Sequence, residues 1–339
     1  MVNIQIGEPT SSMKTNRLIL FSTVILLLIV AISCDAPREN PVDPNNTEKR
    51  LSSISGVVKS QGYPFAPISN ADVFWKNENI LVQTNEDGKY SIPNVIKKNG
   101  WLAFERTGYS NDSVFIDWKN DGTMANEIFL NSNPILDSLE FFSVVENRFQ
   151  FNQKYLIRVR ARVTDYEGVN DIVNVLIENE ELSLLKVLTY DHTQDFYEGT
   201  LTLNDLKITS LNEIIGKNFK LLVKDLEDKV FTVGITNIKR VINEEVELIS
   251  PINNGTVTKP FKLSWKRYTP GYSFKYKVEI FTNETSPSLV YSKCDIAKDS
   301  ISHLVNSEFE GSNFFWVIWA IDEFENQSRS KPGSFIIGN

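Results

Sequence analysis

One seven-residue stretch decides the fold of this 339-residue chain: residues 157–163, which read IRVRARV. Apolar residues and arginines alternate strictly here, which is the pattern of a β-strand with one buried face. A slip of one residue in the register of this strand would bury all three arginines, so the register is strongly fixed. The stretch therefore predicts a strand in a sheet that has its core on one side and solvent on the other.

Similar alternation recurs on both sides of this stretch. Short apolar–polar runs continue from residue 51 to residue 337, and turn signals such as NEDG at residues 85–88 separate them. Short strands at this spacing are typical of β-sandwiches. The hydrophobic content of 41% is sufficient for packed cores, while a net charge of −8 argues against nucleic acid as a partner. We expect an all-β chain of three β-sandwich domains in series.

The predicted domains cover residues 51–132, 133–243 and 244–339. The first boundary is placed at Asn133-Pro134, because proline cannot continue a central strand. Residues 35–50 are polar, contain three prolines and show no periodicity, so they read as an extended tether.

Four motifs mark the first domain: ISGVV at 54–58, PISNADV at 67–73, TNEDGKYSI at 84–92 and RTGY at 106–109. Together they resemble the carboxypeptidase regulatory-like (transthyretin-like) module. The resemblance implies a non-catalytic β-sandwich of a kind found in many exported proteins, with glycan binding as an inherited option. Gly88 is expected to give its turn a positive φ.

The other two domains resemble different sandwich families. The turn TDYEGV at 164–169, between two strands, resembles the Ig-like domains of bacterial surface proteins. The motifs FKLSW at 261–265 and FWVIWAID at 315–322 resemble a fibronectin type III domain, with Trp265 at the position of its core tryptophan. That family usually has tyrosine where this chain has Trp316, so we expect its tyrosine corner hydrogen bond to be absent.

The N-terminal stretch MKTNRLILFSTVILLLIVAISC, residues 13–34, has a basic head, an uncharged apolar run and then Cys34. It resembles a bacterial lipoprotein signal peptide that occupies residues 1–34 and ends at a Cys34 carrying diacylglycerol. The alternative is an uncleaved membrane anchor, although the run is shorter than the roughly 20 residues that a span needs. Met13 opens the signal well, so it is a second candidate start of translation. Either interpretation exports the bulk of the chain, and the first places it in the cell envelope, with the outer membrane or cell surface favoured.

Only two histidines offer acid–base or metal chemistry, His192 and His303. Asp191 and Asp195 flank His192, but a solvated turn is the simpler interpretation, and no Gly-x-Ser-x-Gly stretch supports a hydrolase. We therefore expect no catalytic residue, no enzyme activity and no cofactor.

Three groups of acidic residues could offer oxygens to calcium. They are Asp165, Glu167 and Asp171; Asp322, Glu323 and Glu325; and Glu86 with Asp87. None shows the dense alternation of a calcium loop, and Ca²⁺ requires six to eight converging oxygens. Ordinary turn contacts and no metal are expected.

Aromatic side chains are the best candidates for a ligand or partner surface. The candidate residues are Phe315, Val317, Trp319, Trp101 and Trp118. The first three lie opposite Trp316 and Ile318 in the alternation, which predicts an apolar stripe on the outer sheet of the third domain. Exposed aromatics suit a sugar ring or a protein partner, but packing between domains is favoured over a sugar-binding platform.

Three functional hypotheses follow from the sequence. The first is a non-catalytic, lipid-anchored envelope protein that acts as a structural or protein-interaction module, with the membrane and an envelope protein as partners. The second is a carbohydrate-binding accessory protein of the cell surface. The least favoured is a hydrolase or metal-dependent enzyme that uses His192.

Overall fold

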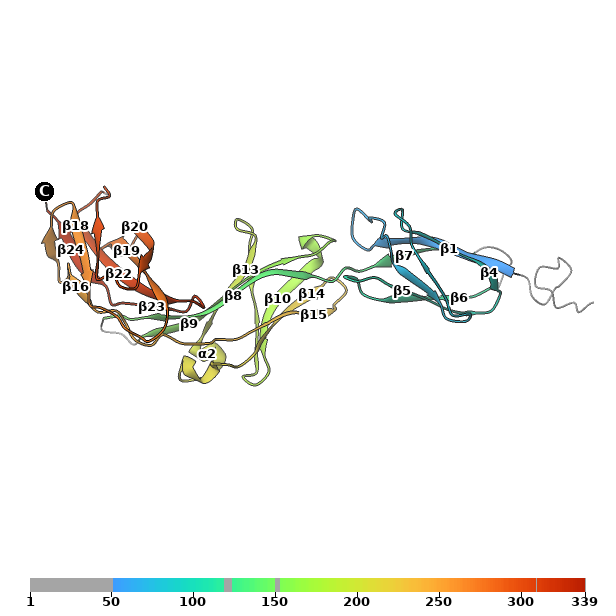
Figure 1. Ribbon diagram of the computed structural model, residues 1–339, viewed down its shortest axis with the longest axis horizontal. Coiled ribbons are helices and arrows are strands. Elements are labelled where there is room, and N and C mark those ends of the chain that lie inside the picture. The colour runs from blue at the N-terminus through green and yellow to red at the C-terminus, as the bar shows by residue number, and fades with distance from the viewer. Residues whose placement is uncertain (1–50, 119–123, 150–152, 309, 339) are drawn as a thin grey trace, which may run out of the picture. The chain divides into compact units, whose positions relative to one another are not determined.

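The computed structural model describes residues 51–118, 124–149, 153–308 and 310–338 (Figure 1). The predicted signal peptide, Cys34 and the tether lie outside these residues. Within them the chain forms strands β1 to β24 and only short helical turns, so the all-β prediction is confirmed. The chain divides into two compact units: residues 51–60 with 65–130, and residues 61–64 with 131–338.

The first unit is a sandwich of two sheets. The three-stranded sheet has the order β4 (Lys89–Ile96), β1 (Leu51–Ser60), β7 (Met124–Leu130). The four-stranded sheet has the order β3 (Ile80–Gln83), β2 (Asp72–Trp75), β5 (Gly100–Glu105), β6 (Asp112–Ile116). The alternation in the sequence sets the core, because Trp75, Ile92 and Leu102 are fully buried between the sheets.

The turn before β4 forms as its sequence predicts. The side-chain oxygen of Asn85 accepts hydrogen bonds from the backbone N–H of Asp87 at 3.1 Å and of Lys89 at 2.8 Å. Gly88 adopts a φ of +71°, and a Cβ at this position would lie 2.4 Å from the carbonyl oxygen of Val58. Both observations explain why glycine is needed here.

The second unit begins with a sandwich built around the IRVRARV strand. One sheet has the order β11 (Leu184–Val187), β10 (Ile172–Asn179), β14 (Phe219–Asp225), β15 (Val230–Thr236). The other contains β12 (Thr189–Asp191), β13 (Phe196–Thr202), β9 (Lys154–Thr164) and β8 (Ile135–Glu146). Ile157, Val159 and Ala161 are fully buried while the arginines between them reach solvent, so the predicted register is confirmed.

Three short helical turns complete this sandwich. They are η1 (Val169–Asp171), α2 (Leu203–Leu206) and η2 (Leu211–Ile214). Capping boxes, in which side chain and backbone of two residues satisfy each other, start α2 at Thr202 and η2 at Ser210.

The C-terminal sandwich lies in the same unit. Its smaller sheet has the order β16 (Leu248–Ser250), β18 (Phe261–Trp265), β21 (Ser302–Val305). The facing strands are β23 (Gln327–Arg329), β22 (Asn313–Asp322), β19 (Phe274–Thr282) and β20 (Leu289–Ala297), with β24 (Gly333–Ile337) paired to β22 and β17 (Gly255–Val257).

Tryptophans form the centre of the C-terminal core. The Trp265 ring packs edge-on against Tyr276, with centroids 5.3 Å apart. Trp316 is fully buried, and its indole N–H donates to the carbonyl oxygen of Pro251 at 2.7 Å. Trp316, for which the sequence comparison with fibronectin type III domains predicts the loss of a tyrosine hydrogen bond, therefore forms an indole hydrogen bond instead.

The two sandwiches of the second unit share one sheet. In Figure 1 the green strand β8 runs alongside β23, from the red part of the chain, and the two pair in parallel with Ser328 opposite Val145. The C-terminal end of β8 is consequently buried on both faces. Phe142 and Val144 point away from the core of their own sandwich and pack in a separate small cluster with Trp319 of the C-terminal sandwich. The division into three domains at residues 133 and 244 stays a prediction, although three main cores are present.

Buried polar side chains, which we call the joint, lie where β8 and β23 meet: Ser143, Asp322, Asn326 and Ser328, with Arg240 beside them. The Asn326 side-chain oxygen accepts from the backbone N–H and the hydroxyl of Ser143, both at 2.9 Å. Asp322 in turn accepts from the Asn326 backbone N–H at 2.9 Å and pairs with Arg240 at 3.2 Å. The joint thus satisfies polar groups that would otherwise be costly to bury.

Candidate functional site

An exposed aromatic cluster lies on the outer side of the four-stranded sheet of the first unit. Trp101 on β5 lies opposite Phe115 on β6, and their rings meet edge to face with centroids 5.3 Å apart. Each of the two side chains is 48% exposed. Phe74 and the exposed Leu81 lie on the same side of β2 and β3, and we call these four residues the aromatic face.

Trp118 is not part of the aromatic face. Its backbone N–H donates to the side-chain oxygen of Asn99 at 2.9 Å, and its ring packs against the core of the first unit. Of the two tryptophans that the sequence singled out in this unit, only Trp101 is presented to solvent.

The predicted stripe Phe315, Val317 and Trp319 is not an open surface. Val317 is fully buried. Trp319 packs against a small cluster that includes Phe142 of the preceding sandwich, and its indole N–H donates to Glu279 at 2.7 Å. The structure thus corrects the expectation of an exposed stripe at Val317 and Trp319 in favour of packing between the sandwiches.

Phe315 differs from its two neighbours in the stripe. It remains half-buried, and its ring stacks on Phe281 of the neighbouring strand β19, with centroids 5.2 Å apart and an interplanar angle of 14°. The predicted stripe is therefore reduced to one accessible aromatic pair.

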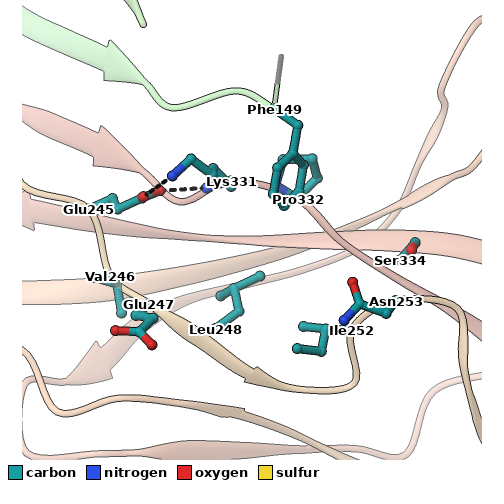
Figure 2. A pocket seen from close by; sticks show the side chains of 10 residues that line it. All are labelled: Phe149, Glu245, Val246, Glu247, Leu248, Ile252, Asn253, Lys331, Pro332 and Ser334. Carbon is teal, nitrogen blue, oxygen red and sulfur yellow. Dashed lines mark hydrogen bonds and ion pairs between the residues drawn. The ribbon is translucent and has the colours of Figure 1, made fainter. Parts of the chain in front are cut away.

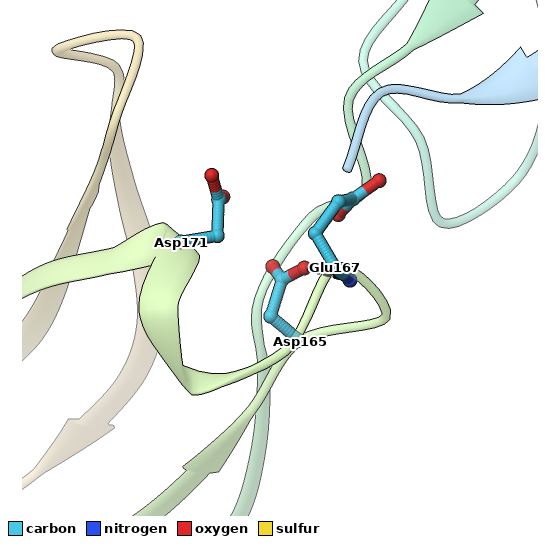
Figure 3. Close-up of side chains that lie close together, drawn as sticks. All are labelled: Asp165, Glu167 and Asp171. Atoms are coloured by element: carbon cyan, nitrogen blue, oxygen red, sulfur yellow. Dashed lines mark hydrogen bonds between the residues drawn. The ribbon is translucent and has the colours of Figure 1, made fainter. Parts of the chain in front are cut away.

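Three acidic side chains after β9 converge: Asp165, Glu167 and Asp171 (Figure 3). Each offers a carboxylate oxygen, and these oxygens lie within 4.8 Å of one another. Ser132 binds two members of the group, because its hydroxyl contacts both Asp165, at 2.5 Å, and Glu167, and its backbone N–H contacts Glu167 at 3.2 Å. The three could hold a metal ion, but alone they fall short of the six to eight oxygens that Ca²⁺ prefers.

Two carboxyl groups of the cluster, Asp165 and Asp171, bind protons more tightly than isolated carboxylates do. Burial, followed by the hydrogen bond with Glu167, raises the pKa of Asp165 to about 7. Burial and the charges of Asp225, Glu167 and Glu227 raise the pKa of Asp171. Negative charges that lie close together away from water favour the protonated form of each carboxyl group. A bound proton can therefore reduce the negative charge of the cluster, as a metal cation would.

The other acidic groups from the sequence are engaged in turns. Asp322 accepts from the backbone N–H groups of Phe324 and Asn326, both at 2.9 Å, and belongs to the joint. Asp87 is exposed and pairs with Lys89 at 3.3 Å. Within the described residues, the Asp165 group is the one whose oxygens converge closely enough for a metal, so the expectation of ordinary turn contacts and no metal stays a prediction there.

The two histidines lie in different surroundings. His303 hydrogen-bonds through Nε2 to the hydroxyl of Tyr291 at 2.7 Å, and burial with the charge of Lys293 lowers its pKa. His192 is exposed and contacts the ring of Tyr190 edge to face. Neither contact is a serine–histidine or cysteine–histidine pair of the kind that activates a nucleophile.

A pocket of about 310 Å³ lies in the C-terminal sandwich, between β16 and the segment before β24 (Figure 2). Phe149 lies over Pro332, while Val246 and Leu248 contribute apolar surface. The main charged groups are already paired. Glu245 accepts from the backbone N–H of Lys331 at 2.9 Å and from its ammonium group at 2.7 Å.

No helix within the described parts of the chain has the length and hydropathy that crossing a membrane requires.

No known protein family matches this sequence, and no curated protein matches it. Solved structures do match. The fibronectin(III)-like modules of CbhA from Clostridium thermocellum are 15% identical over 60% of this chain and 93% of theirs, with a TM-score of 0.28. Domains FN1–FN3 of chicken CNTN1 are 8% identical over 86% and 96%, with a TM-score of 0.30. BcpA, the major pilin subunit of Bacillus cereus, is 10% identical over 86% and 96%, with a TM-score of 0.24. No function follows from likenesses of this size.

Proposed function

We propose that this chain is a lipid-anchored envelope protein whose β-sandwiches serve as a non-catalytic structural or protein-interaction module. The observation that carries the proposal is the sheet shared by the two sandwiches of the second unit. Neighbouring domains usually move relative to each other unless their interface is large and well packed. A shared strand ladder and a buried polar joint oppose such motion, which is what a spacer or scaffold needs.

The membrane anchor of the proposal rests on the sequence. The basic head, apolar run and Cys34 supply the signal, and residues 35–50 supply the tether. The resemblances to carboxypeptidase regulatory-like, Ig-like and fibronectin type III domains agree with a non-catalytic role. Intact mass of the native protein tests the anchor: a diacylglyceryl group on a chain that begins at Cys34, absent from a Cys34→Ala variant, is expected. An unmodified chain that retains Met13 would reject it.

Rigidity of the joint can be measured by electron spin resonance. In a Cys34→Ala background, spin labels on the exposed Cys294 and on Glu198→Cys report the distance between the two sandwiches. We expect a narrow distance distribution that broadens in Asn326→Ala, because this change leaves the buried N–H of Ser143 without its acceptor. Asn243→Ala, an exposed asparagine between the sandwiches, is the matched control. Equal widths in all three proteins would count against a structural role for the joint.

The aromatic face favours a second candidate function, that of a carbohydrate-binding accessory protein. Trp101 and Phe115 are exposed on neighbouring strands of one sheet, and aromatic rings so presented suit stacking on sugar rings. A glycan array probed with the native protein and with Trp101→Ala tests this candidate. Binding that disappears in the variant would support it, and the same binding by both proteins would exclude the aromatic face.

A further inference from the structure

A second pocket, of about 350 Å³, lies in the first sandwich of the second unit. It is found where the chain leaves β11 in one sheet and enters β12 in the other. Besides aliphatic side chains of residues 169–175, its lining includes Asn170, Asn174, Leu188, Tyr190, His192 and Tyr197. The volume lies at the small end of the range of about 300–1,000 Å³ for ligand sites, so it suits one compact ring rather than a long chain.

Aromatic rings form a corner in this pocket. The rings of Tyr190 and His192 are nearly perpendicular, with an interplanar angle of 85° and centroids 4.6 Å apart. Tyr197, which is buried, backs Tyr190 at 4.7 Å. The Tyr190 hydroxyl donates to Asp195 at 2.6 Å, and this bond holds the phenol in place. A small apolar surface of a ligand can therefore pack on the ring of Tyr190 and contact the ring of His192 at its side.

The polar groups of the pocket are available to a ligand. The side-chain amides of Asn170 and Asn174 form no hydrogen bond with any other described residue. Each amide offers two donors and one acceptor, which matches hydroxyl groups. No aspartate, glutamate, lysine or arginine lines the pocket, so it holds no permanently charged side chain that would compensate a charged ligand.

We propose that this pocket binds one neutral sugar ring, with an apolar ring face against Tyr190 and His192 and hydroxyls on Asn170 and Asn174. The inference goes beyond the structural role. It also gives the carbohydrate-binding candidate a site separate from the aromatic face. The pocket in Figure 2 is less suited to such a ligand, because its Glu245 and Lys331 already satisfy each other.

Saturation-transfer NMR on the full chain tests the proposal, in a detergent without a sugar headgroup. The probes are the methyl glycosides of glucose, galactose and N-acetylglucosamine, with glucuronate as the charged comparison. We expect saturation of at least one neutral probe, with a Kd of about 1–10 mM, and none of glucuronate. Tyr190→Ala should weaken binding about tenfold through loss of ring contact, whereas Trp101→Ala should leave it unchanged.

His192→Ala provides a second variant, because this exposed residue can be removed even if Tyr190→Ala does not fold. It should weaken binding severalfold, through the same loss of ring contact. The proposal is overturned if no neutral probe is saturated at about 50 mM, or if glucuronate binds better than the neutral probes. It is also overturned if binding survives His192→Ala in full and is lost in Trp101→Ala, which would assign the sugar to the aromatic face.

Discussion

Strands β5 and β22 both carry aromatic residues on the side away from their own core, and they end in opposite surroundings. Trp101 on β5 is 48% exposed, whereas Val317 on β22 has no exposed surface and Trp319 beside it packs against the preceding sandwich. The alternation rule treats the two strands identically, because it reports which residues share a face. What differs is whether another part of the same unit covers that face.

The cover on β22 is provided by the end of β8. The parallel pairing of β23 with β8 brings Phe142 against Trp319, and the joint holds that pairing in place. In the first unit, the outer side of β5 carries the exposed Trp101–Phe115 pair instead. The outward-facing Trp101 is therefore a candidate for binding a ligand or partner, whereas the outward-facing Trp319 is an internal contact.

Introducing a negative charge on each of the two faces should give the largest difference in the free energy of unfolding. Val317→Asp buries a carboxylate without a partner and is expected to cost more than about 4 kcal/mol of the free energy of unfolding. Phe115→Asp places the same charge at an exposed position and should cost at most about 1 kcal/mol. Urea unfolding followed by circular dichroism measures both. If Val317→Asp does not fold, Val317→Ala should still cost about 2 kcal/mol, and a cost near zero would contradict the burial.

Truncation of Trp319 should have the next largest effect. Trp319→Ala removes the contacts with Phe142, Val144 and Leu156 and the hydrogen bond to Glu279, and we expect a loss of about 3 kcal/mol. Trp319→Phe keeps most of the packing and should cost about 1.5 kcal/mol, the low end of the range for a lost hydrogen bond to a carboxylate. Equal costs for the two variants in urea unfolding would show that packing between the sandwiches contributes little.

The sequence predicts the cores of this chain better than its surfaces. Ile157, Val159 and Gly88 behave as their local patterns indicate, because a strand register and a tight turn are set by neighbouring residues. The cover of Trp319 depends on Phe142, which is distant in the sequence, so no local pattern reveals it.

Candidate sites show the same division. The spacing of Asp165, Glu167 and Asp171 was visible in the sequence, but the hydroxyl of Ser132 that contacts two of them was not. His192 was considered for acid–base chemistry, yet its structural setting is an aromatic corner with Tyr190. That corner meets Asn170 and Asn174 only because the chain changes sheets between β11 and β12.

A change of pH should separate the unfolding of the two units, and so show which unit a variant affects. The folded chain keeps a proton on Asp165 up to about pH 7, whereas the ordinary pKa of this side chain is 3.8. The contribution of Asp165 to the free energy of unfolding of the second unit should therefore fall as the pH rises from about 4 to 7 and level off above, opposite in sign to that of His303, whose pKa is lowered. At pH 8, Asp165→Asn should raise the free energy of unfolding by about 1 kcal/mol, after allowance for solvent screening, and should remove this contribution to the slope. The exposed Asp87→Asn of the first unit is the control, and an unchanged slope in Asp165→Asn would contradict the raised pKa.

The smallest expected effect on stability is that of Trp101→Ala. Half of this side chain already meets water, and its main ring contact is Phe115, which is equally exposed, so the variant should lose less than about 0.5 kcal/mol. Acrylamide quenching gives the complementary measurement, since Trp101 should contribute an accessible fraction of the fluorescence that Trp319 does not. A loss of stability as large as that of Trp319→Ala would mean that Trp101 is an internal contact. The aromatic face would then no longer be a candidate ligand-binding surface. The expected pair of results is a small loss of stability and the disappearance of the quencher-accessible part of the fluorescence. Trp101 would then be an exposed apolar residue that does not stabilise the fold, which is the property expected of a binding surface.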